Sequence, residues 1–211
     1  MGALDAIVKA YDVRGTVPDQ LRPDVAHAFG VAFARFTDAP RLIVGRDMRP
    51  SGVALVQAFA EGVREQGADV VDIGLASTDM LYYAAGSLDA PGAMFTASHN
   101  PAQYNGIKLC LSGARAVGID SGLADIRDIA EQVLDGRGPA PAANPGTLVE
   151  RDILDAFADH VLSFVDPAEI RPLRVVADTA NGMGGLVVPA VFARLPQIEL
   201  EVMYPELDGT F

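Results

Sequence analysis

The chain has 211 residues, half of them hydrophobic, and a formal net charge of −12 at pH 7. This negative field repels polyanions, so we expect neither a nucleic-acid partner nor binding to an anionic membrane surface. The sequence has no apolar run of bilayer length, its first residues lack the order of a secretory signal, and it has one cysteine, so we expect a cytoplasmic protein without a disulfide framework.

The first two thirds of the chain alternate short apolar runs with amphipathic stretches. The short runs predict strands at 8–11, 42–44, 69–73, 92–96 and 106–111. Helices are predicted from Arg22-Pro23, from Ser51 to Gly67, from Ser77 or Thr78 to Gly86, and from Ser121 onward. In the second of these, the Ser51 hydroxyl is the expected cap, and the expected inward side chains are Val53, Val56, Phe59, Ala60 and Val63.

A stretch rich in Pro and Gly, residues 135–146, is the predicted linker between two units. After it the sequence predicts a helix at 153–165, a strand at 173–177, a helix at 186–195 and a strand at 198–203. The alternation of strands and helices favours a layered α/β fold. A second unit with only two strands is too small to cover both faces of a sheet, and we expect it to be incomplete.

The segment Thr96–Pro101, followed by Tyr104–Lys108, carries the densest chemistry of the chain. It contains Ser98, His99, Asn100 and one of only two lysines, Lys108. The Ser98 hydroxyl is a candidate phosphoryl acceptor if a base or metal assists it. The alternative is an ordinary turn, which favours the same Ser, Asn and Pro residues. The segment does not match the G-x-S-x-G elbow of serine hydrolases.

Two further cations are candidates for binding an anion beside Ser98. Lys108 follows Asn105-Gly106, a dipeptide that predicts a turn, and begins a strand. It alternates with Ile107 and Leu109, so it points to the opposite face, either into solvent or toward Ser98. Arg14 follows the first predicted strand and has the planar fork that matches phosphate. The alternative for Arg14 is a surface pair with Asp12.

Other motifs receive mainly structural interpretations. For Gly45–Gly52 we favour a structural turn with Arg46 paired to Asp47, over an anion site at a helix N-terminus. Asp178–Gly185 lacks the glycine spacing of a dinucleotide loop. No histidines or cysteines have metal-ligand spacing, and we expect His27 and His160 at the surface and Cys110 as a buried strand thiol.

Taken in order, six segments resemble the α-D-phosphohexomutase family, most closely its phosphomannomutase/phosphoglucomutase branch. They are Tyr11–Gly15, Gly45–Arg49, Thr96–Pro101, Tyr104–Lys108, Asp178–Gly182 and Asp208–Phe211. The resemblance implies four domains around a cleft. Residues 1–146 would form the first, a mixed-sheet α/β/α sandwich with the phosphoserine loop. Residues 147–211 would begin a second, similar domain, cut off before its metal loop.

The resemblance also implies an activity and its site. Ser98 would carry a phosphate and exchange it with a hexose 1-phosphate or 6-phosphate, of mannose or glucose, through a hexose 1,6-bisphosphate that also acts as activator. Arg14, Asn100 and Lys108 would bind the phosphate, and either Lys108 or His99 would move the proton. Mg²⁺ would bind the Ser98 phosphate, with its remaining ligands beyond residue 211. No protein partner is implied.

Three alternatives remain at this point. A phosphoglucosamine mutase is disfavoured, because that branch tends to have Asp where this chain has Tyr104. A phosphosugar-binding protein without catalysis would not need a half-built second unit. A serine hydrolase would react with a fluorophosphonate at Ser98, which we do not expect. By the leading interpretation, residues 1–211 alone are inactive.

Overall fold

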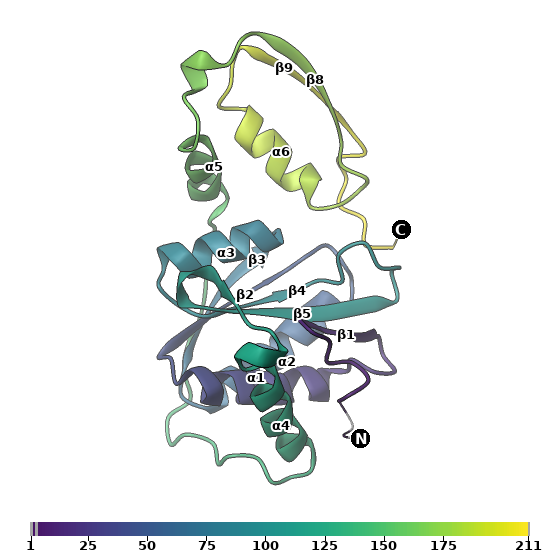
Figure 1. The fold of residues 1–211 in the computed structure, drawn as a ribbon, viewed down its shortest axis with the longest axis vertical. Helices are drawn as coiled ribbons and strands as arrows, with labels where there is room; N and C mark the ends of the chain where they lie inside the picture. Colours follow the sequence, from purple (N-terminus) through teal and green to yellow (C-terminus); the bar gives the residue numbers. More distant parts are fainter. Residues whose placement is uncertain (1, 3, 211) are drawn as a thin grey trace.

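A mixed β-sheet forms the centre of the first unit in the computed structural model, which describes residues 2 and 4–210 (Figure 1). Met1, Ala3 and Phe211, the last residue of the Asp208–Phe211 motif, lie outside the described residues. The strands follow the order β1-β5-β4-β2-β3-β7, with β6 paired to β5. Their bounds are β1 Val13–Thr16, β2 Arg41–Arg46, β3 Asp69–Leu75, β4 Gly92–Phe95, β5 Tyr104–Leu111, β6 Arg115–Ala116 and β7 Leu148–Glu150. The pairs β1–β5, β4–β5 and β5–β6 are antiparallel; β2–β4, β2–β3 and β3–β7 are parallel.

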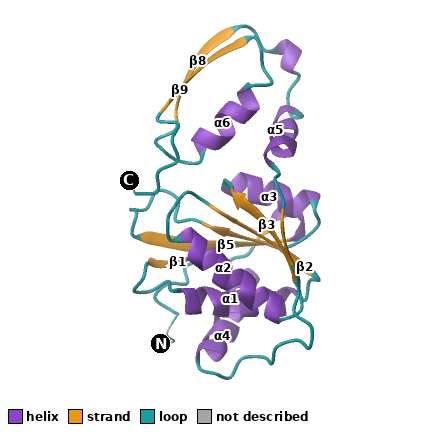
Figure 2. Cartoon of the chain, turned by 180° about the vertical axis from the view of Figure 1, so that it is seen from behind, coloured by secondary structure: helices purple, strands orange, loops and turns teal. Residues whose placement is uncertain are grey.

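Helices cover both faces of this sheet (Figure 2). One apolar core lies between the sheet and α1 (Pro23–Thr37), α2 (Gly52–Glu65) and α4 (Leu123–Leu134). A second core lies on the opposite face, under α3 (Thr78–Ser87) and α5 (Leu154–Leu162). The predicted α/β/α sandwich is therefore confirmed. Short 3₁₀ helices, η1 (Ser112–Ala114), η2 (Ile119–Ser121) and η3 (Pro167–Glu169), lie in the connections.

The second unit is a β-α-β arrangement beside α5 (Figure 1). Strands β8 (Leu173–Asp178) and β9 (Ile198–Met203) pair in parallel, and α6 (Gly184–Phe192) connects them. Leu186 and Val187 of α6 pack against the core under α3, so the two units share apolar contact. In the part of the chain that the structure describes, no helix is both long and apolar enough to cross a lipid bilayer.

Several local predictions differ from the structure. The first strand begins at Val13, and of the predicted run 8–11 only Val8 pairs, in a single bridge to Val13. Asn105 and Gly106 lie inside β5 instead of forming a turn. Val53 is 44% exposed on the outer face of α2. The Ser51 hydroxyl does not cap that helix; it accepts a hydrogen bond from Asn105 Nδ2 at 2.9 Å.

Strand β7 has no counterpart among the sequence-based predictions, although it joins the first unit's sheet. It has only three residues, Leu148, Val149 and Glu150, which is too short a run to show an alternating pattern, and all three are exposed. Asp69 holds it through a tertiary contact, since its Oδ1 accepts hydrogen bonds from both the Thr147 amide and hydroxyl, each at 2.7 Å. These hydrogen bonds to the charged form lower the pKa of Asp69.

Candidate active site around Ser98

Ser98 lies in the loop between β4 and β5, just beyond the last hydrogen bonds that pair these two strands. Strand β4 is fully buried and ends at Phe95. The Thr96 amide still donates a hydrogen bond to the Gly106 carbonyl of β5. Ser98 itself is exposed and has a left-handed backbone, with φ of +54°. Thr96 supports this bend, because its Oγ1 accepts a hydrogen bond from the Ser98 amide at 3.0 Å. The loop therefore presents the Ser98 hydroxyl to solvent instead of packing it.

His99 lies next to the Ser98 hydroxyl. The distance from Ser98 Oγ to His99 Nδ1 is 3.4 Å, and both side chains are exposed. Adjacent residues on a strand would point to opposite faces, but the left-handed bend at Ser98 lets the two side chains converge. This places a proton-accepting ring within reach of the hydroxyl.

Arg14 and Lys108 meet on a single carboxylate oxygen. Asp12 Oδ2 lies 2.6 Å from Arg14 Nη2 and 3.1 Å from Lys108 Nζ. The Asp12 residue is only 8% exposed, so this contact is not the surface pair considered as the alternative for Arg14. Antiparallel pairing of β1 with β5 brings the two cations together, because Arg14 aligns with Gly106, two residues before Lys108.

Arg14 connects this charge cluster to the Ser98 loop. Its Nη1 donates a hydrogen bond to Asn100 Oδ1 at 3.2 Å. Its Nε is buried and is not hydrogen-bonded to any described residue. A buried, charged donor without a partner is costly, and an incoming anion would relieve that cost. Arg14, Asn100 and Lys108 thus form one connected group beside Ser98, in the combination that the sequence predicted.

Arg49 is a buried residue of the site that the sequence analysis did not single out. Asp47 pairs with Arg49, at 3.2 Å from Arg49 Nε, so the predicted pairing of Asp47 with the Arg46 side chain is wrong. Arg46 instead donates to the Asp47 carbonyl at 3.3 Å. The signal for Arg49 was weak in the sequence, since Arg46 and Arg49 both flank Asp47 and only the fold shows which one turns inward.

Residues of the second unit complete one wall beside Ser98. A cavity of about 270 Å³ is lined by Ser98, Thr96, Asp47, Met48 and the start of α3, and by Gly182 and Met183. Gly209 also approaches closely, since a β-carbon on it would lie 2.6 Å from the Arg49 α-carbon. Gly182 and Met183 of the segment 178–185 thus line the same cavity as Ser98.

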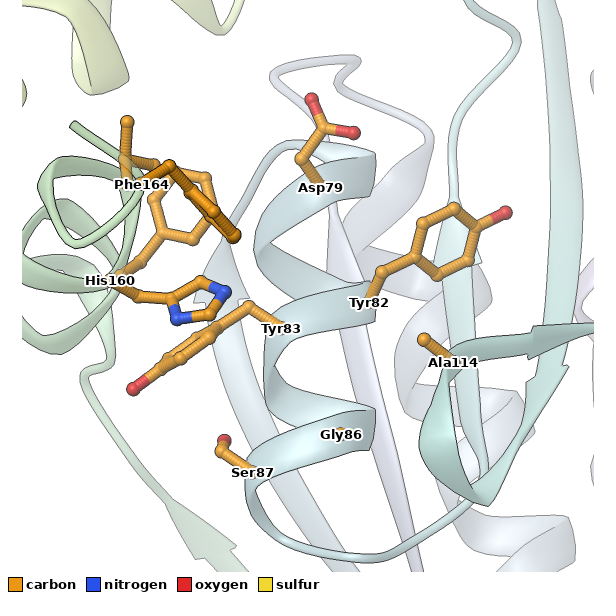
Figure 3. Close-up of a pocket in the computed structure, with 10 residues that line it drawn as sticks. Asp79, Tyr82, Tyr83, Gly86, Ser87, Ala114, His160 and Phe164 are labelled. Atoms are coloured by element: carbon orange, nitrogen blue, oxygen red, sulfur yellow. The ribbon is translucent and has the colours of Figure 1, made fainter.

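A larger cavity, of about 700 Å³, lies away from Ser98 between α3 and α5 (Figure 3). Aromatic rings line it, with His160 between Tyr83 and Phe164 at centroid distances of 4.9 Å each. His160 is exposed, as predicted, while His27 is half-buried, 3.0 Å from Glu65 Oε2. No described residue that we consider for phosphoryl chemistry lines this cavity.

A metal ion would need more ligands than the described residues bring together. Within residues 2 and 4–210, no three His, Cys, Asp or Glu side chains cluster in a way that could hold one. Asp47, the carboxylate that lines the Ser98 cavity from β2's end, is already paired with Arg49. This part of the chain therefore does not form a metal site by itself.

Comparison with known proteins identifies the class of this fold. Residues 5–135 match the family described as phosphoglucomutase/phosphomannomutase, alpha/beta/alpha domain I. The chain therefore belongs to the phosphoglucomutase/phosphomannomutase family, and the resemblance predicted from the six segments is confirmed.

Individual relatives agree with this assignment. A protein described as phosphohexose mutases from Xanthomonas campestris is 40% identical over 206 residues, covering 96% of this chain and 44% of the relative. A phosphomannomutase from Salmonella montevideo is 36% identical, covering 96% of this chain and 45% of its own length. The chain thus spans somewhat under half the length of these curated relatives.

Solved structures support the fold. A phosphoglucomutase/phosphomannomutase family protein from Burkholderia thailandensis superposes with a TM-score of 0.82 at 31% identity, covering 97% of this chain and 45% of that one. A phosphoglucomutase from Paramecium, at 15% identity, has a TM-score of 0.69 over 95% of this chain and shares the fold.

Proposed function

We propose that this chain is the phosphoserine-bearing part of a mutase that interconverts hexose 1-phosphates and hexose 6-phosphates, of mannose, glucose or both. The family assignment supports the class of reaction, and the connected group at Ser98 supports the place. The observation that carries the proposal is an exposed Ser98 hydroxyl in a loop whose Asn100 binds Arg14, which shares the Asp12 carboxylate with Lys108. In a chain with a net charge of −12, this cluster concentrates the positive charge that a phosphoryl group needs.

The proposed reaction moves one phosphoryl group in each direction. Phosphorylated Ser98 donates its group to the free hydroxyl of a hexose monophosphate: the bond from Ser98 Oγ to phosphorus breaks, and a bond from the sugar oxygen forms. The proton of the sugar hydroxyl passes to His99 or Lys108, and the departing Ser98 oxygen takes up a proton to become a free hydroxyl. The hexose 1,6-bisphosphate then reorients and returns its other phosphate to Ser98, which regenerates the phosphoserine. Free hexose 1,6-bisphosphate would phosphorylate an empty Ser98 by the same return step.

Positioning and charge compensation are the contributions of these residues, since phosphoryl transfer needs little covalent help. The Arg14 fork, fixed by Asp12 on one side and Asn100 on the other, would bind the equatorial oxygens with its unpaired Nε. Lys108 would add a second positive charge. A Mg²⁺ ion bound to the Ser98 phosphate would supply further charge neutralisation, with its other ligands outside the residues described here.

The proposal is tested by locating phosphate on the protein. We expect phosphopeptide mapping of the natural polypeptide to find one phosphate, on Ser98, after exposure to hexose 1,6-bisphosphate. Ser98→Ala should remove both the phosphate and the mutase activity. Ser163→Ala is the matched control, because that exposed hydroxyl contacts only the His160 carbonyl, at 2.6 Å. Phosphate found only on other residues, or full activity in Ser98→Ala, would refute the proposal.

A further inference from the structure

The segment Gly45–Gly52 was predicted to be a structural turn. It contains an arginine, Arg49, whose side chain has no solvent exposure. Arg49 is 0% exposed, and Asp47 fixes it at two points. Asp47 Oδ1 accepts a hydrogen bond from the Arg49 amide at 3.0 Å, and Asp47 Oδ2 lies 3.2 Å from Arg49 Nε. A short loop after β2 therefore sets both the backbone and the guanidinium plane of Arg49.

The outer edge of this guanidinium faces the Ser98 loop. Arg49 Nη2 donates to the Ser98 and Asn100 carbonyls, at 2.8 and 2.7 Å. Arg49 Nη1 donates to the Pro101 and Tyr104 carbonyls, at 2.9 and 3.0 Å. One side chain thus binds four carbonyls of one loop, which spans the residues from the hydroxyl to the start of β5.

Only a guanidinium fits this set of acceptors. Its donors lie in one plane at fixed angles, whereas a lysine ammonium places three donors around a point and reaches fewer carbonyls at once. Without Arg49 the loop would lose four hydrogen bonds at once, all of them part-buried and all from one rigid side chain. The conformation of the loop therefore depends on Arg49 as well as on the hydrogen bond from the Ser98 amide to Thr96.

The contact at the Ser98 carbonyl has a direct effect on the reacting serine. Ser98 has a φ of +54°, a left-handed conformation that is unfavourable for a residue other than glycine. The fixed carbonyl keeps Ser98 in this conformation. Because carbonyl and amide point in opposite directions across a trans peptide, it also turns the His99 N–H away from Arg49. Strain of this kind persists where the surroundings over-determine it.

We infer that Arg49 is a positioning residue for phosphoryl transfer at Ser98: it never touches substrate, but it fixes where the hydroxyl lies. This inference rests on the proposed function. It assigns a role to the Gly45–Gly52 motif that the phosphate-binding residues do not account for.

The test is Arg49→Lys in the natural polypeptide, with Arg137→Lys as matched control. Arg137 lies in the linker and pairs with Asp135 at the surface. We expect Arg49→Lys to lower kcat on the order of a hundredfold while KM stays within about threefold, because substrate binding is retained and alignment is lost. Arg137→Lys should leave both constants unchanged. A folded Arg49→Lys protein with wild-type kcat, or with only KM changed, would overturn the inference.

Amide hydrogen exchange gives a readout that does not depend on catalysis. In Arg49→Lys we expect faster exchange at Ser98, His99 and Tyr104, with unchanged exchange in β2 and β4. Unchanged exchange in the loop contradicts the positioning role even if the protein proves not to be a mutase. Wild-type protein without activity and without phosphate on Ser98 contradicts the proposed function instead.

A second variant covers the case in which Arg49→Lys fails to fold. Asp47→Asn keeps the guanidinium but removes the charge that orients it. We expect a folded protein with kcat lowered about tenfold and KM nearly unchanged. Wild-type kcat in Asp47→Asn, together with wild-type exchange at Ser98, would count against the inference.

Discussion

The Asp12 carboxylate binds two cationic side chains at once, Arg14 and Lys108. One of its oxygens meets two cations, so the pair of positive charges keeps a fixed separation without a ligand. The negative charge of Asp12 offsets part of their mutual repulsion. The net charge left over is still positive, which suits an anionic group entering beside Ser98.

Burial of Cys110 leads to a prediction about alkaline pH. Cys110 is fully buried in β5, and desolvation raises the pKa of its thiol from 9.0 to about 11. The folded state thus favours the protonated thiol. Its contribution to stability is fully present below pH 9 and is lost as the pH rises through about 11. The loss amounts to about 3 kcal/mol, measured as the free energy of unfolding by urea between pH 8 and 11.

The control for this prediction is Cys110→Ala. Tyr82 lies nearby and its pKa is also raised by burial, but it stays in both proteins. The difference in alkaline slope between wild type and Cys110→Ala therefore reports the thiol together with its charge interaction with Tyr82, which also raises the pKa of that tyrosine. Equal slopes in the two proteins would show that the thiol reaches water in the folded state.

At the scale of elements, the site depends on β5 lying very close to both of its neighbours. A β-carbon on Gly106 would lie 2.5 Å from the Val13 carbonyl oxygen and 2.8 Å from that of Thr96. Both contacts are with backbone, which cannot rotate away. Gly106→Ala should therefore lower the free energy of unfolding by about 1 to 3 kcal/mol, as measured by urea titration.

Gly86→Ala provides the opposite case. Gly86 lies in the exposed face of α3, and a β-carbon there would meet nothing within 4 Å. We expect this substitution to raise the free energy of unfolding by about 0.5 to 1 kcal/mol, because alanine favours the helix. If both variants shift stability in the same direction, crowding does not explain Gly106.

The sequence predicted the elements whose apolar faces are complete and missed those that tertiary contacts create. Helix α1 has its apolar residues at helical spacing, and it begins at Pro23, as Arg22-Pro23 predicted. Strand β7 was missed because its exposed residues show no alternation. Asn105-Gly106 predicted a turn by its local chemistry, but pairing with β1 and β4 on both sides overrides that preference.

The sequence could predict candidate residues of the site, but not the contacts that link them. The residues and the family resemblance together predicted Ser98, His99, Asn100, Arg14 and Lys108, and the structure links Arg14 to Asn100 and, through Asp12, to Lys108; their roles remain predictions. The bridging role of Asp12 and the inward turn of Arg49 depend on the register between distant strands. No spacing in the sequence encodes which of two arginines beside Asp47 is buried.

On the scale of the whole molecule, the described residues present the exposed Ser98 hydroxyl but no cluster of three His, Cys, Asp or Glu side chains that could hold a metal ion. Its curated relatives are more than twice as long, since the chain covers 44% and 45% of them. We predict that residues 1–211 alone show no measurable conversion of mannose or glucose 1-phosphate to the 6-phosphate, in a coupled assay with Mg²⁺ present. Turnover by this chain, with a Ser98→Ala preparation as blank, would show that the catalytic machinery is complete within it.

The approach of Gly209 to Arg49 has a mechanical consequence. The contact joins backbone to backbone, with no side chain between that bends under load. Asp208 is tied in turn to Asn181 through a 3.0 Å amide-to-carbonyl bond. The backbone of this segment is therefore packed directly on the residue that binds the Ser98 carbonyl, so a displacement of Gly209 toward Arg49 would have to move Arg49 as well.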